Sequence, residues 1–211
     1  MIYYRHGSRD ENKIALTFDD GPNPPITLEI LDILDDYDVK ANFFVLGKWV
    51  KNHPAVLRDM YKRGHLIGNH GYGHDINNQG FEANQEIIFN TIGEQPLFCR
   101  PPYCYLEALK VANHCELVTS LKLKLITFDV DPDDNHMPGS DVIFKKVIGA
   151  CQNGSIIDLH DSSEKPEEQA SRPLEMLEAL PLIIKSLKEK FEIVRLDQMS
   201  LVPIEFKEDS L

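Results

Sequence analysis

The chain has 211 residues, and its 22 basic and 34 acidic side chains give a formal net charge of −12. This charge argues against nucleic acid or an anionic membrane as a partner, because both are negative. Apolar residues make up 42% of the chain and charged residues 27%, which is typical of a soluble domain with its own core. We therefore expect a single domain over residues 1–211, with its core at about 12–197 and a C-terminal tail at 200–211.

The sequence gives no signal for membrane insertion or export. No stretch approaches the ~20 apolar residues that a membrane-spanning helix needs, and residues 1–6 have no apolar segment of signal-peptide length. The expectation is a protein without a membrane span that either stays in the cytosol or is exported with a segment absent from this chain. The cysteines show no CxxC spacing, so they are expected to be reduced.

Short β-branched runs alternate with longer helical patterns along the chain. The runs predict strands at 14–18, 41–45, 65–68, 97–100, 125–129, 155–160 and 191–196. The helical patterns predict helices around 30–34 and at 54–62, 82–90, 106–113, 141–150 and 174–190. Strands separated by helices form parallel β/α units, and about seven such units predict an α/β fold with a closed or nearly closed barrel.

Most of the predicted strands end in polar residues. These are Asp19-Asp20, Asn69-His70, Arg100, Asp129 and Asp131, and His160-Asp161. In a parallel barrel the carboxyl ends of the strands converge on one rim, where active sites are built. The pattern therefore predicts that these side chains meet at one site.

Asp20, His70 and His74 form a candidate metal site. The two histidines are four residues apart, so both rings can reach one ion. With Asp20 they supply two nitrogens and one oxygen and leave positions open for water and substrate, as catalytic zinc requires. Taken alone, the Asp19-Asp20 pair is as typical of a turn or a helix cap, and two histidines at this spacing also occur by chance.

Asp19, Arg100 and His160 are candidates for catalytic groups. Adjacent carboxylates point in different directions, so Asp19 can face a substrate while Asp20 binds a metal. Arg100 can hold Asp19 ionised through a salt bridge, and His160 can protonate a leaving amine. Asp131 would raise the pKa of His160 if it touches the ring. A surface arginine before a turn and a solvated acidic loop are the plain alternatives for Arg100 and Asp131.

Five motifs occur in a fixed order along the chain. They are TFDDGP at 17–22, HxxxH at 70–74, RPPY at 100–103, DxxD at 131–134 and LHD at 159–161. In this order they resemble the polysaccharide deacetylase family, the fourth family of carbohydrate esterases, over roughly residues 12–197. The resemblance implies a distorted (β/α)₇ barrel. It also implies a metal-dependent hydrolase that removes the N-acetyl group from N-acetylglucosamine-containing glycan, such as chitin oligosaccharide or peptidoglycan, and releases acetate.

The resemblance further implies a metal and a base. Asp20, His70 and His74 would bind zinc, or cobalt, which lowers the pKa of water and polarises the acetamide carbonyl. Asp19 would be the general base that takes a proton from that water. Arg100 would orient Asp19.

Three more residues acquire roles by the same resemblance. The backbone N–H of Tyr103 would contribute to the oxyanion hole. His160 would be the general acid, and Asp131 would be its partner.

Three positions depart from the pattern of the family. Gly71 stands where a Ser or Thr hydroxyl usually braces the metal loop. Asn135 and Asp158 replace a Trp and a Leu that help form the apolar pocket for the acetyl methyl group. We therefore place Asp158, Asn135 and Tyr103 in the substrate pocket and hypothesise that it takes a smaller or polar acyl group, or is solvated. Alternatively, Asp158 pairs with a nearby cation and another aromatic side chain fills the space.

Two other functions stay open. One is a cytosolic deacylase of a small acylated amino sugar, which the missing signal segment and the changed pocket favour. The other is a catalytically weak glycan-binding relative, which the presence of the base, the metal ligands, the acid and Arg100 disfavours.

Overall fold

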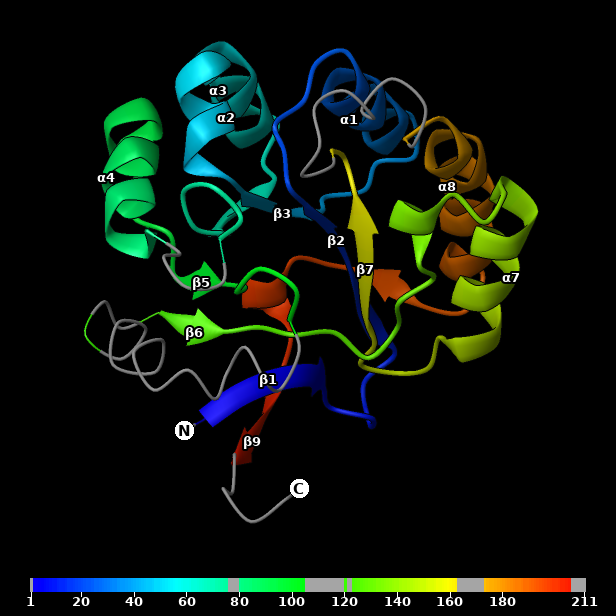
Figure 1. Cartoon of the computed structure of the whole chain (residues 1–211). Coiled ribbons are helices and arrows are strands. Elements are labelled where there is room, and N and C mark those ends of the chain that lie inside the picture. The colour runs from blue at the N-terminus through cyan, green and yellow to red at the C-terminus, as the bar shows by residue number, and fades with distance from the viewer. Residues whose placement is uncertain (1, 76–79, 105–119, 121–122, 163–172, 206–211) are drawn as a thin grey trace.

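The structure is a computed structural model that describes residues 2–75, 80–104, 120, 123–162 and 173–205 (Figure 1). Its elements, in chain order, are β1 (Ile2–Gly7), β2 (Lys13–Asp19), α1 (Ile26–Asp36), β3 (Asn42–Val45), α2 (Gly47–Asn52), α3 (Pro54–Lys62), β4 (Leu66–Asn69), α4 (Phe81–Ile92), β5 (Phe98–Cys99), β6 (Lys124–Leu125), η1 (Asp134–His136), α7 (Ser140–Ala150), β7 (Ile156–His160), α8 (Pro173–Lys188), β8 (Glu192–Ile193), η3 (Leu196–Gln198) and β9 (Leu201–Glu205).

Seven parallel strands form one curled sheet. The strand order is β6-β5-β4-β3-β2-β7, and β8 also pairs with β2. An isolated parallel bridge between Val130 and Ile157 joins the segment after β6 to β7, so the two ends of the sheet approach each other. The predicted single-domain α/β fold is confirmed, and the predicted distorted (β/α)₇ barrel takes the form of a curled parallel sheet, a half-barrel.

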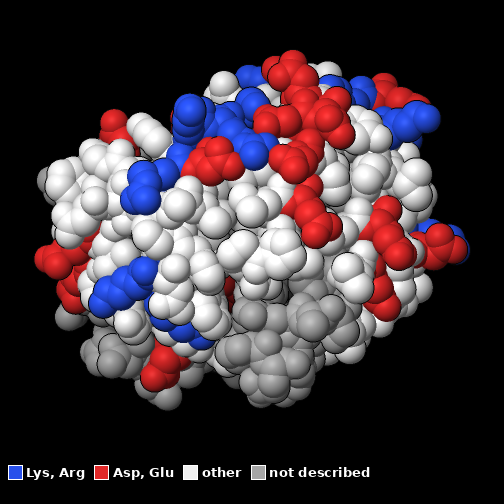
Figure 2. Space-filling model, turned by 90° about the horizontal axis from the view of Figure 1, so that it is seen from above, with Lys and Arg blue, Asp and Glu red and all other residues white. Residues whose placement is uncertain are grey.

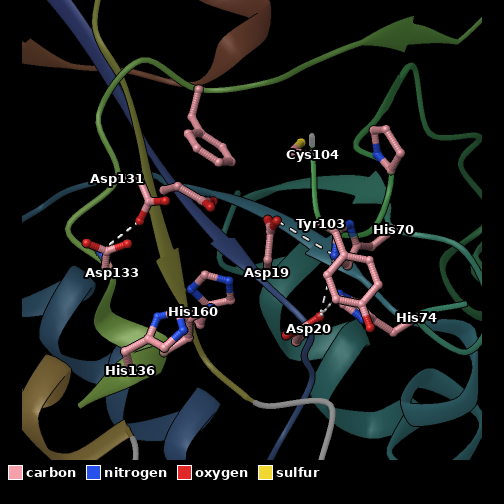
Figure 3. Close-up of a pocket in the computed structure, with 14 residues that line it drawn as sticks. Asp19, Asp20, His70, His74, Tyr103, Cys104, Asp131, Asp133, His136 and His160 are labelled. Atoms are coloured by element: carbon pink, nitrogen blue, oxygen red, sulfur yellow. Dashed lines mark hydrogen bonds and ion pairs between the residues drawn. The ribbon is translucent and has the colours of Figure 1, made fainter. Parts of the chain in front are cut away.

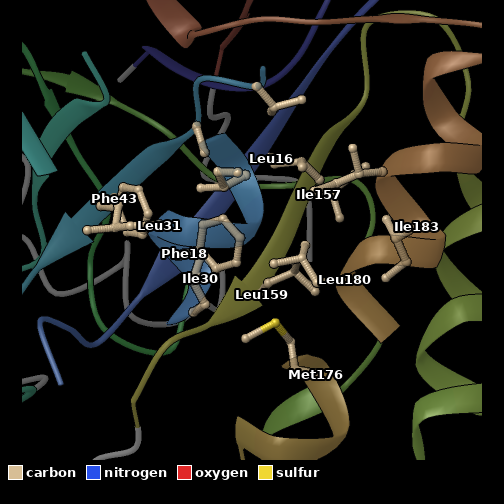
Figure 4. Packing of buried hydrophobic residues seen from close by; sticks show 14 of the residues in the cluster. Leu16, Phe18, Ile30, Leu31, Phe43, Ile157, Leu159, Met176, Leu180 and Ile183 are labelled. Atoms are coloured by element: carbon tan, nitrogen blue, oxygen red, sulfur yellow. The ribbon is translucent and has the colours of Figure 1, made fainter. Parts of the chain in front are cut away.

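The two faces of the sheet have different partners. Leu16 and Phe18 on β2, with Ile157 and Leu159 on β7, pack against helices such as α1 and α8 (Figure 4). All four side chains are fully buried, and each contributes about 1.5–3 kcal/mol through burial. Because side chains alternate along a strand, the residues between them face the inside of the curled sheet.

Several elements match the predicted boundaries closely. Helix α3 covers the predicted residues, with Pro54 in its first turn and Gly64 just beyond its end. Helix α7 begins at Ser140 and its N-cap is Gly139, so Asp141 lies in the first turn and does not cap the helix. The helix predicted at 106–113 lies outside the described residues.

The termini differ from the prediction. Strands β1 and β9 pair antiparallel, with Ile2 opposite Glu205 and Tyr4 opposite Pro203. Residues 201–205 are therefore part of a two-stranded sheet and not of a tail. Neither strand was predicted, because its partner lies about two hundred residues away along the chain.

The predicted strand at 125–129 is shorter than expected. Strand β6 has only two residues, and beyond it Ile126 makes an isolated bridge to Tyr4. The side chain of Asp129 accepts a hydrogen bond from the backbone N–H of Ile156 (2.8 Å). This side-chain contact stands where a backbone ladder would otherwise continue.

None of the helices in the described part of the chain is long and apolar enough to cross a bilayer.

The surface charge agrees with the acidic composition of the chain. On the face seen in Figure 2, acidic and basic side chains lie interspersed, which fits a solvated acidic surface. Cys99, Cys104 and Cys151 are free thiols.

Candidate active site

Two neighbouring strands carry the polar centre of the site. In the β2–β7 ladder Thr17 lies opposite Asp158, and Asp19 lies opposite His160. Since Phe18 between them packs into the helix-side core, alternation sends these four side chains to the inside of the sheet. The register alone therefore brings two carboxylates and one imidazole together.

Arg100, directly after β5, joins these side chains. It is fully buried, and its Nη1 donates to Asp19 Oδ1 (2.8 Å), Thr17 Oγ1 (2.8 Å) and Asp158 Oδ1 (2.5 Å). Its guanidinium carbon lies 4.4 Å from the ring centroid of Phe44. One cation thus holds two buried carboxylates, and it fixes the direction of Asp19.

The buried position of Asp158 changes its acidity. Burial raises the pKa of Asp158 well above its ordinary value, and the charge of Asp19 raises it further, whereas Arg100 opposes the shift. Like charges this close disfavour double ionisation. Asp158 is therefore the member of the pair that carries a proton more readily than a free aspartate.

Asp20, His70 and His74 converge on one point (Figure 3). Their donor atoms all lie within 4.8 Å of one another, and Asp20 Oδ1 is 3.4 Å from Nε2 of each histidine. Asp20 Oδ1 is buried and has no hydrogen-bond partner among the described residues. Two imidazole nitrogens and a carboxylate oxygen are ligands that zinc and similar divalent ions accept, so the group fits a metal ion.

The residues around Asp20, His70 and His74 favour the binding of a cation. His70 Nδ1 lies 2.7 Å from the carbonyl oxygen of Arg100. Because a carbonyl only accepts, Nδ1 carries a hydrogen, and Nε2 is the ring atom that faces Asp20. Burial alone would raise the pKa of Asp20, but the nearby His70 and His74 rings lower it to about 2. Arg100 therefore orients the candidate base with its side chain and a candidate metal ligand with its backbone.

A buried amide cluster supports the loop that carries the histidines. Asn69 Oδ1 accepts from the backbone N–H of Gly71 (2.9 Å) and from Asn84 Nδ2 (2.8 Å). Gly71 has a φ of 82°, which glycine adopts without strain. Asn69 and Asn84 thus brace the loop at the position where we expected a missing hydroxyl to matter.

His160 has a different partner from the one we predicted. Its Nδ1 lies 2.8 Å from Asp134 Oδ1, and its backbone N–H donates to Asp134 Oδ2 (2.8 Å). Asp131, the predicted partner, accepts instead from the backbone N–H of Asp133 (2.8 Å) and is exposed. The prediction of Asp131 as the contact was wrong: the η1 turn buries Asp134 against the ring, and Asp131 lines the same cavity without a hydrogen bond to His160.

This contact changes the acidity of the histidine. Burial would lower the pKa of His160, but the charge and hydrogen bond of Asp134 raise it well above its ordinary value. The ring is therefore held as a cation that can donate a proton. Asp131 is nonetheless part of the same cavity, at its rim.

The candidate metal ligands, Asp19, Asp131 and His160 line one cavity of about 230 Å³. Figure 3 shows Asp20, His70 and His74 on one side, His160 and Asp131 on the other, and Asp19 between them. The further lining residues are Pro101, Tyr103, Cys104, Phe128, Asp133, Asn135, His136 and Asp158. The cavity thus contains every site residue predicted from the sequence except the fully buried Arg100, which lies behind it.

Tyr103 and Phe128 add aromatic surface to the cavity. Tyr103 has a φ of 66° and is 41% exposed. Its ring packs edge-on against the ring of His74, with 4.5 Å between the ring centroids. Phe128 was not predicted as a site residue, because the sequence of its predicted strand does not indicate toward which face of the sheet the side chain points. Asp158 is paired with Arg100, and Phe128 lines the same cavity. This arrangement matches the alternative in which Asp158 pairs with a cation and another aromatic side chain fills the space.

Two strand-end carboxylates have structural roles. Asp129 pairs with Arg9 (2.7 Å), away from the cavity lining. Asp161 accepts from the Thr27 hydroxyl (2.5 Å), and burial together with the charge of Asp20 raises its pKa to about 7. The pattern of polar residues at strand ends therefore identifies the rim of the sheet. It does not identify which of these residues face the cavity.

Comparisons with known proteins agree with this architecture. The polysaccharide deacetylase family model matches residues 6–124. The chitooligosaccharide deacetylase of Sinorhizobium fredii is 34% identical over 196 residues, which cover 86% of this chain and 88% of that protein. The peptidoglycan-N-acetylmuramic acid deacetylase PdaC of Bacillus subtilis is 32% identical over 202 residues, which cover 92% of this chain and 40% of PdaC, so the chain spans less than half of that relative.

A solved structure is also similar over nearly the whole chain. The crystal structure of the Bc1960 peptidoglycan N-acetylglucosamine deacetylase has a TM-score of 0.84 at 31% identity, covering 93% of this chain and 92% of that one. The α/β fold with a curled parallel sheet is thus shared with a solved deacetylase. The chain belongs to the polysaccharide deacetylase family, as its five motifs predicted.

Proposed function

We propose that this protein is a metal-dependent hydrolase that removes the N-acetyl group from N-acetylglucosamine-containing glycan, chitin oligosaccharide or peptidoglycan, and releases acetate. The observation that carries the proposal is the position of Asp19. Asp19 lies between the metal-binding group, which consists of Asp20, His70 and His74, and His160 (Figure 3). Its Oδ1 accepts a hydrogen bond from Arg100 Nη1 (2.8 Å). A base, an acid and a Lewis-acid site around one cavity are the parts that amide hydrolysis needs.

A divalent ion held by Asp20, His70 and His74 would polarise the amide carbonyl and lower the pKa of water in the cavity. We propose zinc as this ion, with cobalt as an alternative, because the ligand set is two imidazoles and one carboxylate. Two observations support this assignment: Nε2 of His70 faces Asp20, and the buried Oδ1 of Asp20 makes no hydrogen bond to any described residue.

The side chains divide the proton transfers between them. Asp19 accepts a proton from the attacking water, since the hydrogen bond from Arg100 fixes the direction of its carboxylate. His160, held as a cation by Asp134, gives a proton to the leaving nitrogen. The backbone N–H of Tyr103 stabilises the oxygen on which negative charge develops. Because Asp19 and His160 lie side by side on paired strands, both can reach one amide.

The test is a mass-spectrometric screen for released acid. The metal-free protein, and the protein loaded with zinc or cobalt, are each incubated with chitooligosaccharides and peptidoglycan fragments. We expect acetate from the loaded protein alone. No release from any substrate by protein that demonstrably binds metal would refute the proposal.

The polar Asp158 and Asn135 in the cavity favour one second candidate. This is a deacylase of a small soluble acylated amino sugar. It is tested in the same screen by adding acylated mono- and disaccharides. Faster release from these than from oligomers would select it, and faster release from oligomers would reject it.

A further inference from the structure

Asp158 lies in the buried part of the cavity. Strand β7 ends at His160, and Asp158 lies two residues earlier on the same face of the strand, so that one ligand atom each of Asp19, Asp158 and His160 lies within 4.8 Å of the others. Asp158 is 3% exposed and contacts the fully buried Arg100, yet it lines the same cavity as the metal-binding group. Its carboxyl group is therefore a polar surface that a molecule bound beside Asp19 and His160 meets in the buried part of the cavity.

The orientation of a substrate follows from the proposed function, on which this inference rests. Asp19 serves the attacking water and His160 serves the leaving nitrogen, so the amide bond lies between them. The sugar chain is attached to the nitrogen and has to leave through the open mouth of the cavity. The acyl group is on the other side of the carbonyl carbon, and it therefore points toward Asp158.

One oxygen of Asp158 is engaged and the other is available. Oδ1 accepts from Arg100 (2.5 Å) and lies 3.5 Å from the Thr17 hydroxyl. Oδ2 makes no hydrogen bond to any residue that the structure describes. An alkyl group packed against Oδ2 would leave a buried polar atom without a partner, which weakens binding. A hydroxyl group both donates and accepts, so it suits this carboxyl in either ionisation state.

We propose that Asp158 is a specificity-determining residue for the acyl group, and that the site prefers a short hydroxylated acyl, the N-glycolyl (hydroxyacetyl) amide. In the reaction, water adds its oxygen to the carbonyl carbon, the C–N bond breaks, the amine leaves with a proton, and glycolate is released. Acyl groups that end in a carboxylate are disfavoured, because Asp19 and Asp158 already share the single cation of Arg100.

The test compares three versions of one chitooligosaccharide, with N-acetyl, N-glycolyl or N-propionyl groups. Propionyl matches glycolyl in size but has a methyl group in place of the hydroxyl. For the zinc-loaded protein we expect kcat/KM to be about tenfold higher for glycolyl than for propionyl. The preference over acetyl is smaller, because the shorter acyl leaves room for a water molecule on Asp158.

Two variants at the same position separate hydrogen bonding from packing. Asp158→Leu should remove the glycolyl preference, whereas Asp158→Asn should keep it, because an amide also donates and accepts. Metal content and thermal unfolding are measured for both variants. Should Asp158→Leu fail to fold, the wild-type ratio of glycolyl to propionyl and the Asp158→Asn variant decide the question.

The outcomes distinguish this inference from the proposed function. Hydrolysis of the acetyl substrate with no preference for glycolyl over propionyl overturns the inference and leaves the deacetylase proposal intact. An equal preference in wild type and in folded Asp158→Leu also overturns it. If none of the three substrates releases acid, both the proposed function and the inference fail.

Discussion

The carboxylate of Asp134 holds His160 at two points, with Oδ1 2.8 Å from Nδ1 of the ring and Oδ2 accepting from the backbone N–H at 2.8 Å. The first contact stabilises the imidazolium, and the second fixes the end of β7 from which the ring projects. Because the contact with Nδ1 occupies one ring nitrogen, Nε2 is the atom that can give a proton to a leaving amine.

Replacing Asp134 with Asn should lower both the rate and the upper pH limit of activity. His160 has a raised pKa in the folded protein, so its acidic form is present below that pKa and is lost as the pH rises through it. Without the Asp134 charge that pKa falls, and the alkaline limb of kcat/KM should move to lower pH. At neutral pH we expect a loss of roughly 10²-fold or more.

Asp131→Asn is the matched control for this variant. Asp131 bonds to the backbone of its own loop and acts on His160 only through its charge, so we expect a change of only a few-fold and a smaller shift of the alkaline limb than in Asp134→Asn. A larger effect from Asp131→Asn than from Asp134→Asn would show that the His160 partner is assigned to the wrong residue.

Metal removal should destabilise the protein as well as inactivate it. A ligand present at 100 times its dissociation constant stabilises the folded state by about 2.7 kcal/mol, which corresponds to about 5–10 °C in Tm for a chain of this size. We expect added zinc to raise the Tm of metal-free protein by this amount, measured by calorimetry. The shift should disappear in Asp20→Asn and persist in His136→Gln, since His136 lines the cavity outside the metal-binding group. Equal shifts in both variants would place the metal elsewhere.

Gly21 allows close packing beside the metal-binding group. A Cβ at this position would lie 2.1 Å from Oδ2 of the buried Asp161, so Gly21→Ala should cost about 1–3 kcal/mol and weaken zinc binding by displacing the adjacent Asp20. Gly73→Ala is the control, because a Cβ there meets nothing within 4 Å. Urea unfolding and zinc titration measure both effects. A Gly21→Ala protein as stable as Gly73→Ala would contradict the packing argument.

Elements set by local chemistry were predictable from the sequence. Strand β2 follows from an apolar run buried on both faces, and α3 follows from a proline at its start and a glycine after its end. The pairing of β1 with β9 was not predictable, because register across the whole chain leaves no local pattern. The fold class needs only the alternation of strands and helices, which explains why it was predicted although β6 is short.

The chemistry of the site was predictable as a set of residue types, but its contacts were not. Motif order and strand ends identified the cavity residues, whereas the choice between Asp131 and Asp134 depends on a turn that spacing does not specify. Asp20, His74 and Tyr103 adopt positive φ values of 78°, 61° and 66°. Residues other than glycine rarely adopt positive φ values, and no pattern in the sequence predicts them at these positions.

The most direct test of the account measures metal content and acetate release together in Asp19→Asn. In the structure Asp19 is held by Arg100, whereas Asp20 belongs to the metal-binding group. We therefore predict that the variant and the wild type each bind one zinc per chain, while the kcat of the variant for acetate release is lower by roughly 10²–10⁴-fold. Near-wild-type release, or loss of zinc together with activity, would contradict the assignment of Asp19 as the base beside a separate metal site.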